Sequence, residues 1–258
     1  MSDPIRLQYD GRIANLIMDG DDKNTIDDRF LTSFRNAMNE VEKSEARVMV
    51  IRSAKEGFFS NGFNPDVFLG APKDKIRASF KALLVMGADQ FFFPLPTISL
   101  ITGYAAGGGA FIAAYSDFRF MSMKKARIGF TEVNLAMTVP SSGLEILSRK
   151  IGYQNVLQTV LTGNLFKAEE CLRYNIVDEI CEDDETTVKK AEAMAKKIAG
   201  LPRTSLLSLK KNAAHWIPRD HFERLIEQDL DEIEKLMVLP ECQGAFAALK
   251  AGKRPKFD

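Results

Sequence analysis

Residues 98–120 read ISLITGYAAGGGAFIAAYSDFRF, and this stretch decides the fold class. The apolar run at 98–101 predicts a buried strand, and the three glycines at 107–109 predict a tight turn. Residues 110–115 then predict a buried helix that ends before Asp117, followed by another strand at 118–122. Alternating buried strands and helices are typical of α/β proteins, so we expect that class.

No charged residue lies between Gln90 and Ser116, a length that resembles a membrane span. A spanning helix needs about 20 unbroken apolar residues. Here Pro94, Pro96 and the glycine run interrupt the stretch. We therefore interpret it as a buried strand, a turn and a buried helix, and we expect no membrane association.

The sequence before this stretch continues the alternation. Residues 5–18 alternate around Asp10-Gly11 and predict a β-hairpin. Residues 27–42 have the apolar spacing of a helix, and residues 48–51 form a short apolar run that predicts a buried strand. Residues 57–72 are rich in glycine and proline, so we expect a loop with at most one helical turn.

The sequence after it ends in helices. Residues 76–92 predict a helix and 128–130 a strand, whereas 188–249 are almost entirely helical in pattern and punctuated by prolines. One helical piece carries an apolar stripe, formed by Leu225, Ile226, Leu230, Ile233 and Leu236. A stripe of this kind covers either the core of its own chain or another subunit, and the sequence leaves both open.

Composition excludes several classes of function. The 258 residues carry 35 Lys+Arg and 35 Asp+Glu, so the net charge is zero and there is no electrostatic footprint for nucleic acid. Three cysteines without a CxxC pair argue against disulfides and thiolate metal sites. The ends show no secretory, lipidation or peroxisomal signal, so we expect a cytoplasmic protein.

Familiar catalytic and nucleotide-binding motifs are absent. The two histidines, His215 and His221, lie in the helical tail outside any HExxH motif, which disfavours a zinc site or a serine triad. No GxGxxG and no GxxxxGK[ST] occurs. We therefore expect neither a metal nor a nucleotide cofactor.

Two glycine-containing loops each follow a predicted buried strand. The run at 107–109 leaves backbone N–H groups free at the start of a helix, and the loop FFSNGFNPD at 58–66 offers donors around Gly62. Facing each other, such loops would form an oxyanion hole, which acyl-transfer and enolate chemistry require. The alternative for 107–109 is a tight turn at which a helix packs closely on a strand.

A third segment, GFTEVNL at 129–135, places Glu132 among apolar residues. A carboxylate in such surroundings has a raised pKa and suits a general base. A helix-capping or salt-bridged glutamate is the alternative.

The ordered set of these pieces resembles the crotonase superfamily, also called the enoyl-CoA hydratase/isomerase family, over essentially the whole chain. Matching segments are FFSNGFNPD, ISLITGYAAGGGAFIAAYSDFRF, FTEVNLAMTVP, IGYQNVLQTVLTGNLFKAEECLRYNIVDEI and FAALKAGKRPKF. The resemblance implies a crotonase-like spiral of ββα units, residues 1–195, with a C-terminal helical trimerisation or lid region, residues 196–258. It also implies acyl-CoA thioester substrates, no cofactor beyond the CoA of the substrate, and a homotrimer or dimer of trimers.

The resemblance assigns roles to individual positions. The backbone N–H groups of Phe63 and Gly108 become the oxyanion-hole donors, and Glu132 becomes the catalytic residue. The expected pocket lining is Phe111, Asn61, Gly62, Gly107, Leu135 and Pro140. The basic residues Lys253, Arg254 and Lys256 are expected to contact the phosphates of CoA, with a solvated charged tail as the alternative.

One departure from the family pattern indicates the reaction. Hydratases of the family carry a second glutamate at the position of Phe111, and an apolar ring cannot hold a water molecule. A single carboxylate suits a Δ3,Δ2-enoyl-CoA isomerase, and Pro140 occupies the place where some isomerases carry their glutamate. The alternatives are a hydratase or decarboxylase-like lyase in which Glu145 supplies the missing acid, and a non-catalytic acyl-CoA-binding protein.

Overall fold

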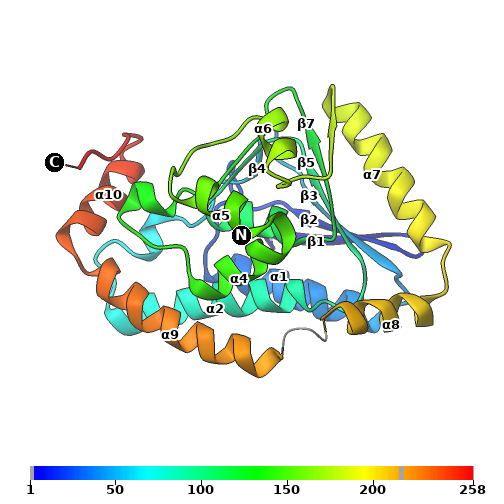
Figure 1. Ribbon diagram of the computed structural model, residues 1–258, viewed down its shortest axis with the longest axis horizontal. Helices are drawn as coiled ribbons and strands as arrows, with labels where there is room; N and C mark the ends of the chain where they lie inside the picture. The colour runs from blue at the N-terminus through cyan, green and yellow to red at the C-terminus, as the bar shows by residue number, and fades with distance from the viewer. Residues whose placement is uncertain (1–2, 215–217, 258) are drawn as a thin grey trace.

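The computed structural model describes residues 3–214 and 218–257. Its main sheet has six strands in the order β1-β2-β3-β5-β7-β9, in which only β1 and β2 pair antiparallel (Figure 1). The strands are β1 (Ile5–Asp10), β2 (Ile13–Met18), β3 (Val48–Ser53), β5 (Thr97–Ile101), β7 (Phe118–Ser122) and β9 (Glu179–Cys181). The predicted hairpin is confirmed, since Asp10 pairs with Ile13 across the turn.

Helices cover both faces of the main sheet, which confirms the α/β class. Met49 and Ile51 of β3 face the larger core, shared with α1 (Asp28–Lys43) and α3 (Gly108–Tyr115). Val48 and Val50 face the opposite core, against α7 (Asp184–Ala199). Successive side chains of a strand point to opposite faces, so a strand covered on both sides carries apolar residues on both, as 48–51 do.

The predicted loop at 57–72 contains a short strand, which belongs to a second sheet of three strands. The strands are β4 (Phe58–Ser60), β6 (Tyr104–Ala106) and β8 (Arg127–Gly129), all parallel, in the order β4-β6-β8. After β4 comes the short 3-10 helix η1 (Pro65–Val67). Three residues are too few to show a period of two, and their partners lie far along the chain, so local sequence does not reveal β4 or β6.

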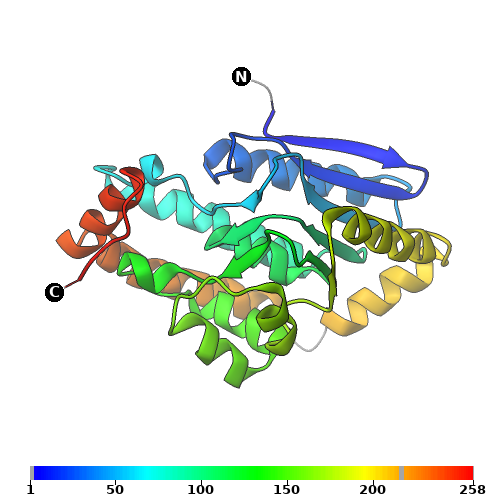
Figure 2. The same cartoon turned by 90° about the horizontal axis from the view of Figure 1, so that it is seen from above.

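The apolar stripe of α9 (Arg219–Met237) covers the core of its own chain. Ile226, Leu230 and Ile233 are buried in one cluster with Ile76 and Phe80 of α2 (Lys73–Phe91). The two helices run alongside each other below the sheet in Figure 1, and Figure 2 shows the same pairing from above. Of the two possibilities left open by the sequence, the intramolecular one holds for this stripe.

The remaining helices surround these layers. They are α4 (Ser141–Ile151), α5 (Tyr153–Val160), α6 (Ala168–Arg173), α8 (Arg203–Ala214) and α10 (Pro240–Lys250), together with the 3-10 helix η2 (Glu132–Leu135). The predicted C-terminal helical region is therefore present, and the expected boundary at residue 195 falls inside α7. Within the described residues, no helix combines the length and the apolar character needed to cross a membrane.

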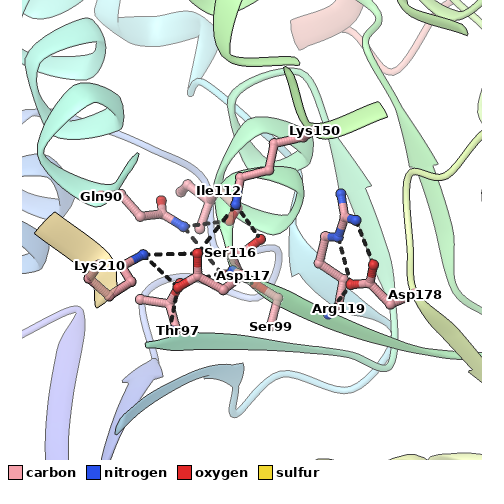
Figure 3. A network of polar contacts seen from close by, with 10 residues as sticks. All are labelled: Gln90, Thr97, Ser99, Ile112, Ser116, Asp117, Arg119, Lys150, Asp178 and Lys210. Carbon is pink, nitrogen blue, oxygen red and sulfur yellow. Dashed lines mark hydrogen bonds and ion pairs between the residues drawn. The ribbon is translucent and has the colours of Figure 1, made fainter. Parts of the chain in front are cut away.

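A partly buried ionic network ties α4 and α8 to the main sheet. Asp117, just before β7, accepts hydrogen bonds from Lys210 of α8 at 2.6 and 2.8 Å and lies 3.4 Å from Lys150 of α4 (Figure 3). Burial alone would raise the pKa of Asp117, but the two lysine charges outweigh burial and lower it. This network fixes α4, which contributes one wall of the site described below.

Candidate active site

The site forms at the carboxyl ends of the three short strands. Because β4, β6 and β8 are parallel, the chain leaves all three at the same edge of the small sheet. Three segments therefore meet there: residues 61–63, residues 107–108, and residues 130–132. The carboxyl edge of a parallel sheet is where α/β proteins commonly bind ligands.

Two glycines allow the first two segments to approach each other. Gly62 has a φ of +74°, and a Cβ atom there would lie 2.7 Å from the carbonyl oxygen of Ala106 and 3.3 Å from the nitrogen of Gly108. A Cβ atom on Gly109 would lie 2.2 Å from the carbonyl oxygen of Ser60. Any larger residue would push the two loops apart, so the glycines are needed for this close contact.

The two predicted oxyanion donors lie in these adjoining loops. Among the described residues, none accepts a hydrogen bond from the backbone N–H of Phe63 or of Gly108. Gly108 is the first residue of α3, so its N–H lies at the positive end of the helix dipole. Both donors belong to residues that line the cavity described below. Their arrangement suits an anionic oxygen.

Glu132 begins η2 immediately after the third strand. Its Oε1 atom lies 3.3 Å from the position that a Cβ atom of Gly107 would occupy. Its Oε2 atom is buried and has no hydrogen-bond partner among the described residues. Burial raises the pKa of Glu132 from 4.5 to about 7. The carboxyl group is thus neither capped nor salt-bridged, and it is poised to exchange a proton near neutral pH.

Phe111 gives the site an apolar wall. Its ring lies 5.0 Å from that of Phe130 and 5.7 Å from that of Tyr115, measured between centroids. Glu145, the alternative acid, hydrogen bonds to His221 at 2.8 Å and Arg149 at 3.2 Å and does not line the cavity. Among the described lining residues, Glu132 is the only carboxylate.

A cavity of about 540 Å³ opens from this edge of the small sheet. Every residue expected in the pocket lines it: Asn61, Gly62, Gly107, Phe111, Leu135 and Pro140, together with Phe63, Gly108 and Glu132. The other walls come mainly from α2, α3 and α4. The structure thus brings together residues that are up to 79 positions apart, from 61 to 140.

The basic C-terminal residues divide into two groups. Lys253, Arg254 and Lys256 all follow α10 and are exposed, but only Lys253 and Arg254 line the cavity. The position of α10 is held by an ion pair of 2.5 Å between Lys250 and Asp66 and by an edge-on ring contact between Phe68 and Phe246. Two positively charged side chains therefore belong to the cavity lining.

Several cavity residues were not anticipated from the sequence. They include the polar residues Tyr115, Gln90, Thr131 and Ser142. In the sequence, Tyr115 and Gln90 belong to the uncharged stretch and show the same spacing as core residues. Of these four, only Thr131 could have been expected in the site from the sequence, because it directly precedes the predicted base Glu132.

Comparisons with known proteins agree with this geometry. The family described as enoyl-CoA hydratase/isomerase matches residues 10–253. The chain is 29% identical to the carnitinyl-CoA dehydratase of Salmonella typhi over 217 residues, which are 82% of this chain and 80% of that protein.

Two solved structures share the fold. The enoyl-CoA hydratase from Bacillus halodurans has a TM-score of 0.87 and 22% identity, covering 95% of this chain and 99% of that one. The human mitochondrial Δ3,Δ2-enoyl-CoA isomerase has a TM-score of 0.87 and 20% identity, covering 96% and 97%. The predicted crotonase-like fold is confirmed. Since a hydratase and an isomerase fit equally well, the fold does not discriminate between their reactions.

Proposed function

The chain belongs to the enoyl-CoA hydratase/isomerase family, and from this premise we propose that it moves the double bond of a 3-enoyl-CoA to the 2-trans position. Membership of the family indicates an enzyme that acts on CoA thioesters. The choice of isomerisation rests on one observation: Glu132 is the only carboxylate in the described lining, to which Phe111 contributes an apolar ring.

The first half of the proposed reaction forms an enolate. The thioester oxygen accepts hydrogen bonds from the N–H groups of Phe63 and Gly108, and the Glu132 carboxylate removes a proton from C2. The electron pair of the broken C–H bond moves onto the thioester oxygen. Donors aimed at the developing charge stabilise the enolate more than the neutral carbonyl, and each contributes about 3 to 4 kcal/mol at comparable sites.

The second half returns the same proton. As the enolate collapses, a double bond forms between C2 and C3, the electrons of the old C3–C4 double bond take the proton at C4, and Glu132 is again a carboxylate. One carboxyl group can serve both transfers when C2 and C4 of the bound substrate present the same side to it. No water takes part, and the apolar ring of Phe111 disfavours a held water at the reacting carbons.

Isotope transfer tests the single-base mechanism. A 3-enoyl-CoA deuterated at C2 is converted in ordinary water, and the product is analysed for deuterium at C4 by NMR. Retention of part of the label at C4 supports one shielded carboxyl group that carries the proton across. Complete washout, together with full activity in Glu132→Gln, would count against the proposal, because a different base would then be at work.

Hydration or dehydration is the second candidate. It is favoured by the similarity to a protein named carnitinyl-CoA dehydratase and by the side chain of Thr131, which lies beside Glu132 in the lining. A hydroxyl group could hold a water molecule that Phe111 cannot. Addition of water to a 2-enoyl-CoA by the wild-type protein would favour this candidate.

The other expectations from the sequence stay predictions. They are an acyl-CoA substrate bound with its CoA at Lys253, Arg254 and Lys256, the absence of a separate cofactor, a homotrimer or dimer of trimers, and a cytoplasmic location. The division at residue 195 is also a prediction.

A further inference from the structure

The hydroxyl group of Tyr115 is an unpaired polar group inside the cavity. Tyr115 is only 6% exposed and lines the cavity from the last turn of α3. No described residue donates a hydrogen bond to its hydroxyl group or accepts one from it. Phe111, on the same helix, lies four residues closer to the oxyanion donors. Tyr115 therefore lies about 6 Å further along the helix axis than Phe111, away from the reacting end.

Two glycines on opposite walls hold the Tyr115 ring. A Cβ atom on Gly87 of α2 would lie 3.0 Å from ring carbon Cε2, and one on Gly143 of α4 would lie 3.3 Å from the hydroxyl oxygen. A glycine inside a helix costs roughly 0.5 to 1 kcal/mol relative to alanine. Gly87 thus makes room for the Tyr115 ring, and Gly143 makes room for both Tyr115 and Phe111, whose Cε1 atom would lie 3.2 Å from a Cβ atom on Gly143.

The Tyr115 hydroxyl group is a permanent hydrogen-bond donor. Burial raises its pKa above the ordinary value of 10, and the nearby charges of Glu132 and Asp229 raise it further. The group therefore stays protonated over the whole range in which an enzyme works. What it lacks is an acceptor.

An unpaired acceptor lies on the neighbouring helix. The amide nitrogen of Gln90 donates to the carbonyl oxygen of Ile112 at 2.8 Å, as Figure 3 shows, but its Oε1 atom is buried with no partner among the described residues. Gln90 lies one turn of α2 beyond Gly87 and lines the same cavity. This oxygen has almost no accessible surface, so a ligand in the cavity does not reach it, whereas the Tyr115 hydroxyl group is unpaired and belongs to a residue of the lining.

The hydroxyl oxygen of Tyr115 would find no hydrogen-bond partner in a purely hydrocarbon acyl chain. A buried polar group without a partner costs about 1 to 3 kcal/mol, and phenylalanine would fill the same slot without that cost. The other aromatic side chains of this lining, Phe111 and Phe222 among them, have no such group.

Building on the proposed function, we infer that the hydroxyl group of Tyr115 forms a specificity subsite for a hydroxyl group carried by the acyl chain beyond the reacting carbons. The oxygen of such a hydroxyl group can accept the hydrogen bond that Tyr115 has to donate, which a CH₂ group cannot do. The favoured substrates are therefore hydroxylated acyl-CoA thioesters rather than plain ones.

Equilibrium binding tests the subsite independently of turnover. Saturated octanoyl-CoA and its hydroxy derivatives, with the hydroxyl group placed in turn on C5 to C8, are titrated into the protein by calorimetry. These thioesters contain no double bond, so they report binding alone. In the wild type, at least one positional isomer should bind about threefold to tenfold more tightly than octanoyl-CoA, the gain typical of one added hydrogen bond.

Two variants identify the residue responsible. In Tyr115→Phe the ratio of the two affinities should fall to about one, and the variant should unfold at no lower temperature than the wild type, since no hydrogen bond of the described residues is lost. Tyr153→Phe is the matched control, because Tyr153 is 67% exposed on α5 and outside the cavity. It should keep the wild-type ratio.

The outcomes separate the two proposals. If every hydroxy isomer binds the wild type no more tightly than octanoyl-CoA, or if Tyr115→Phe keeps the preference, this inference is overturned and the proposed function is untouched. If octanoyl-CoA itself does not bind, the proposed function and the subsite fall together.

Discussion

Oε1 of Glu132 lies 3.3 Å from the place that a Cβ atom of Gly107 would occupy. The base therefore lies beside the turn that presents Gly108, although Glu132 and Gly107 are 25 positions apart in the sequence. This contact exists because β6 and β8 are adjacent parallel strands and both segments leave them at the same edge. Substitutions in the turn are thus expected to act on the chemistry and not only on folding.

Gly62→Ala should lower kcat/KM by about 100-fold or more. The added methyl group would lie 3.3 Å from the Gly108 nitrogen and 2.7 Å from the Ala106 oxygen, so the two donors would be forced apart. Losing one oxyanion donor costs roughly 10² to 10³ in rate. Steady-state kinetics with a 3-enoyl-CoA provides the measurement.

The matched control for this substitution is Gly11→Ala. Gly11 also has a positive φ, +57°, but nothing lies within 4 Å of its Cβ position. It has comparable backbone strain and lies in the hairpin turn between β1 and β2. If Gly11→Ala lowers kcat/KM as much as Gly62→Ala, the loss comes from destabilisation and the oxyanion assignment loses its support.

The rate of isomerisation should rise with pH and level off above neutrality. Glu132 must be ionised to remove the C2 proton, and burial raises its pKa to about 7. Plotted against pH, kcat/KM should therefore increase about tenfold per unit below 7 and reach a plateau above it. A profile that is flat from pH 5 to 9 would contradict the assignment of Glu132 as the base.

Glu132→Gln should be more stable than the wild type, but only at higher pH. The pKa of Glu132 is raised in the folded state, so the folded protein holds a proton between pH 4.5 and about 7 that the unfolded chain releases. The wild type therefore loses stability as pH rises through this window, whereas the neutral glutamine loses none. Urea unfolding should show the difference growing by roughly 2 to 3 kcal/mol between pH 4.5 and 8. A constant difference would contradict the raised pKa.

Phe111→Glu should add hydratase activity. The new carboxyl group would face Glu132 across the cavity and could hold and activate a water molecule that the phenyl ring cannot. Loss of absorbance of a conjugated 2-enoyl-CoA measures the gain. Phe111→Leu is the control, since it stays apolar and should remain inactive toward water. Equal hydration by both variants would mean that space rather than the carboxyl group matters.

Replacing Lys253 and Arg254 together by alanine should raise KM for a CoA thioester and leave kcat nearly unchanged. Both side chains line the cavity. In the proposed reaction they would bind the phosphates of CoA and take no part in the proton transfer by Glu132. The same variant should act normally on an N-acetylcysteamine thioester, which lacks the phosphates. A parallel Lys256→Ala variant measures whether the exposed third residue contributes. An equal loss with both kinds of thioester would exclude phosphate contact.

Much of this architecture could be predicted from the sequence because it depends on local patterns. Apolar residues in the hairpin, the buried strands and the helices follow the spacing typical of each element. Asp27 caps α1 by accepting a hydrogen bond from the Phe30 nitrogen at 2.8 Å. Strands β4 and β6 could not be predicted, since each has three residues and is stabilised by a distant partner.

The residues of the site also fall into two groups, those that the sequence reveals and those that it does not. Gly62, Gly107 and Glu132 stand out in the sequence because glycines and a lone carboxylate are unusual in apolar surroundings. Tyr115 and Gln90 do not stand out, because only the packing of α2, α3 and α4 shows that their polar atoms are unpaired. The signal for such residues lies in their hydrogen-bond partners, which the sequence does not contain.

The central claim is that one carboxyl group shuttles a proton and does not activate water. A side-by-side assay of the wild-type protein tests it most directly, following conjugated-thioester absorbance with a 3-enoyl-CoA and, separately, with a 2-enoyl-CoA. Isomerisation through Glu132 predicts a rise with the first substrate and no change with the second. A fall with the second substrate, meaning that water adds to the double bond despite Phe111, would contradict the claim.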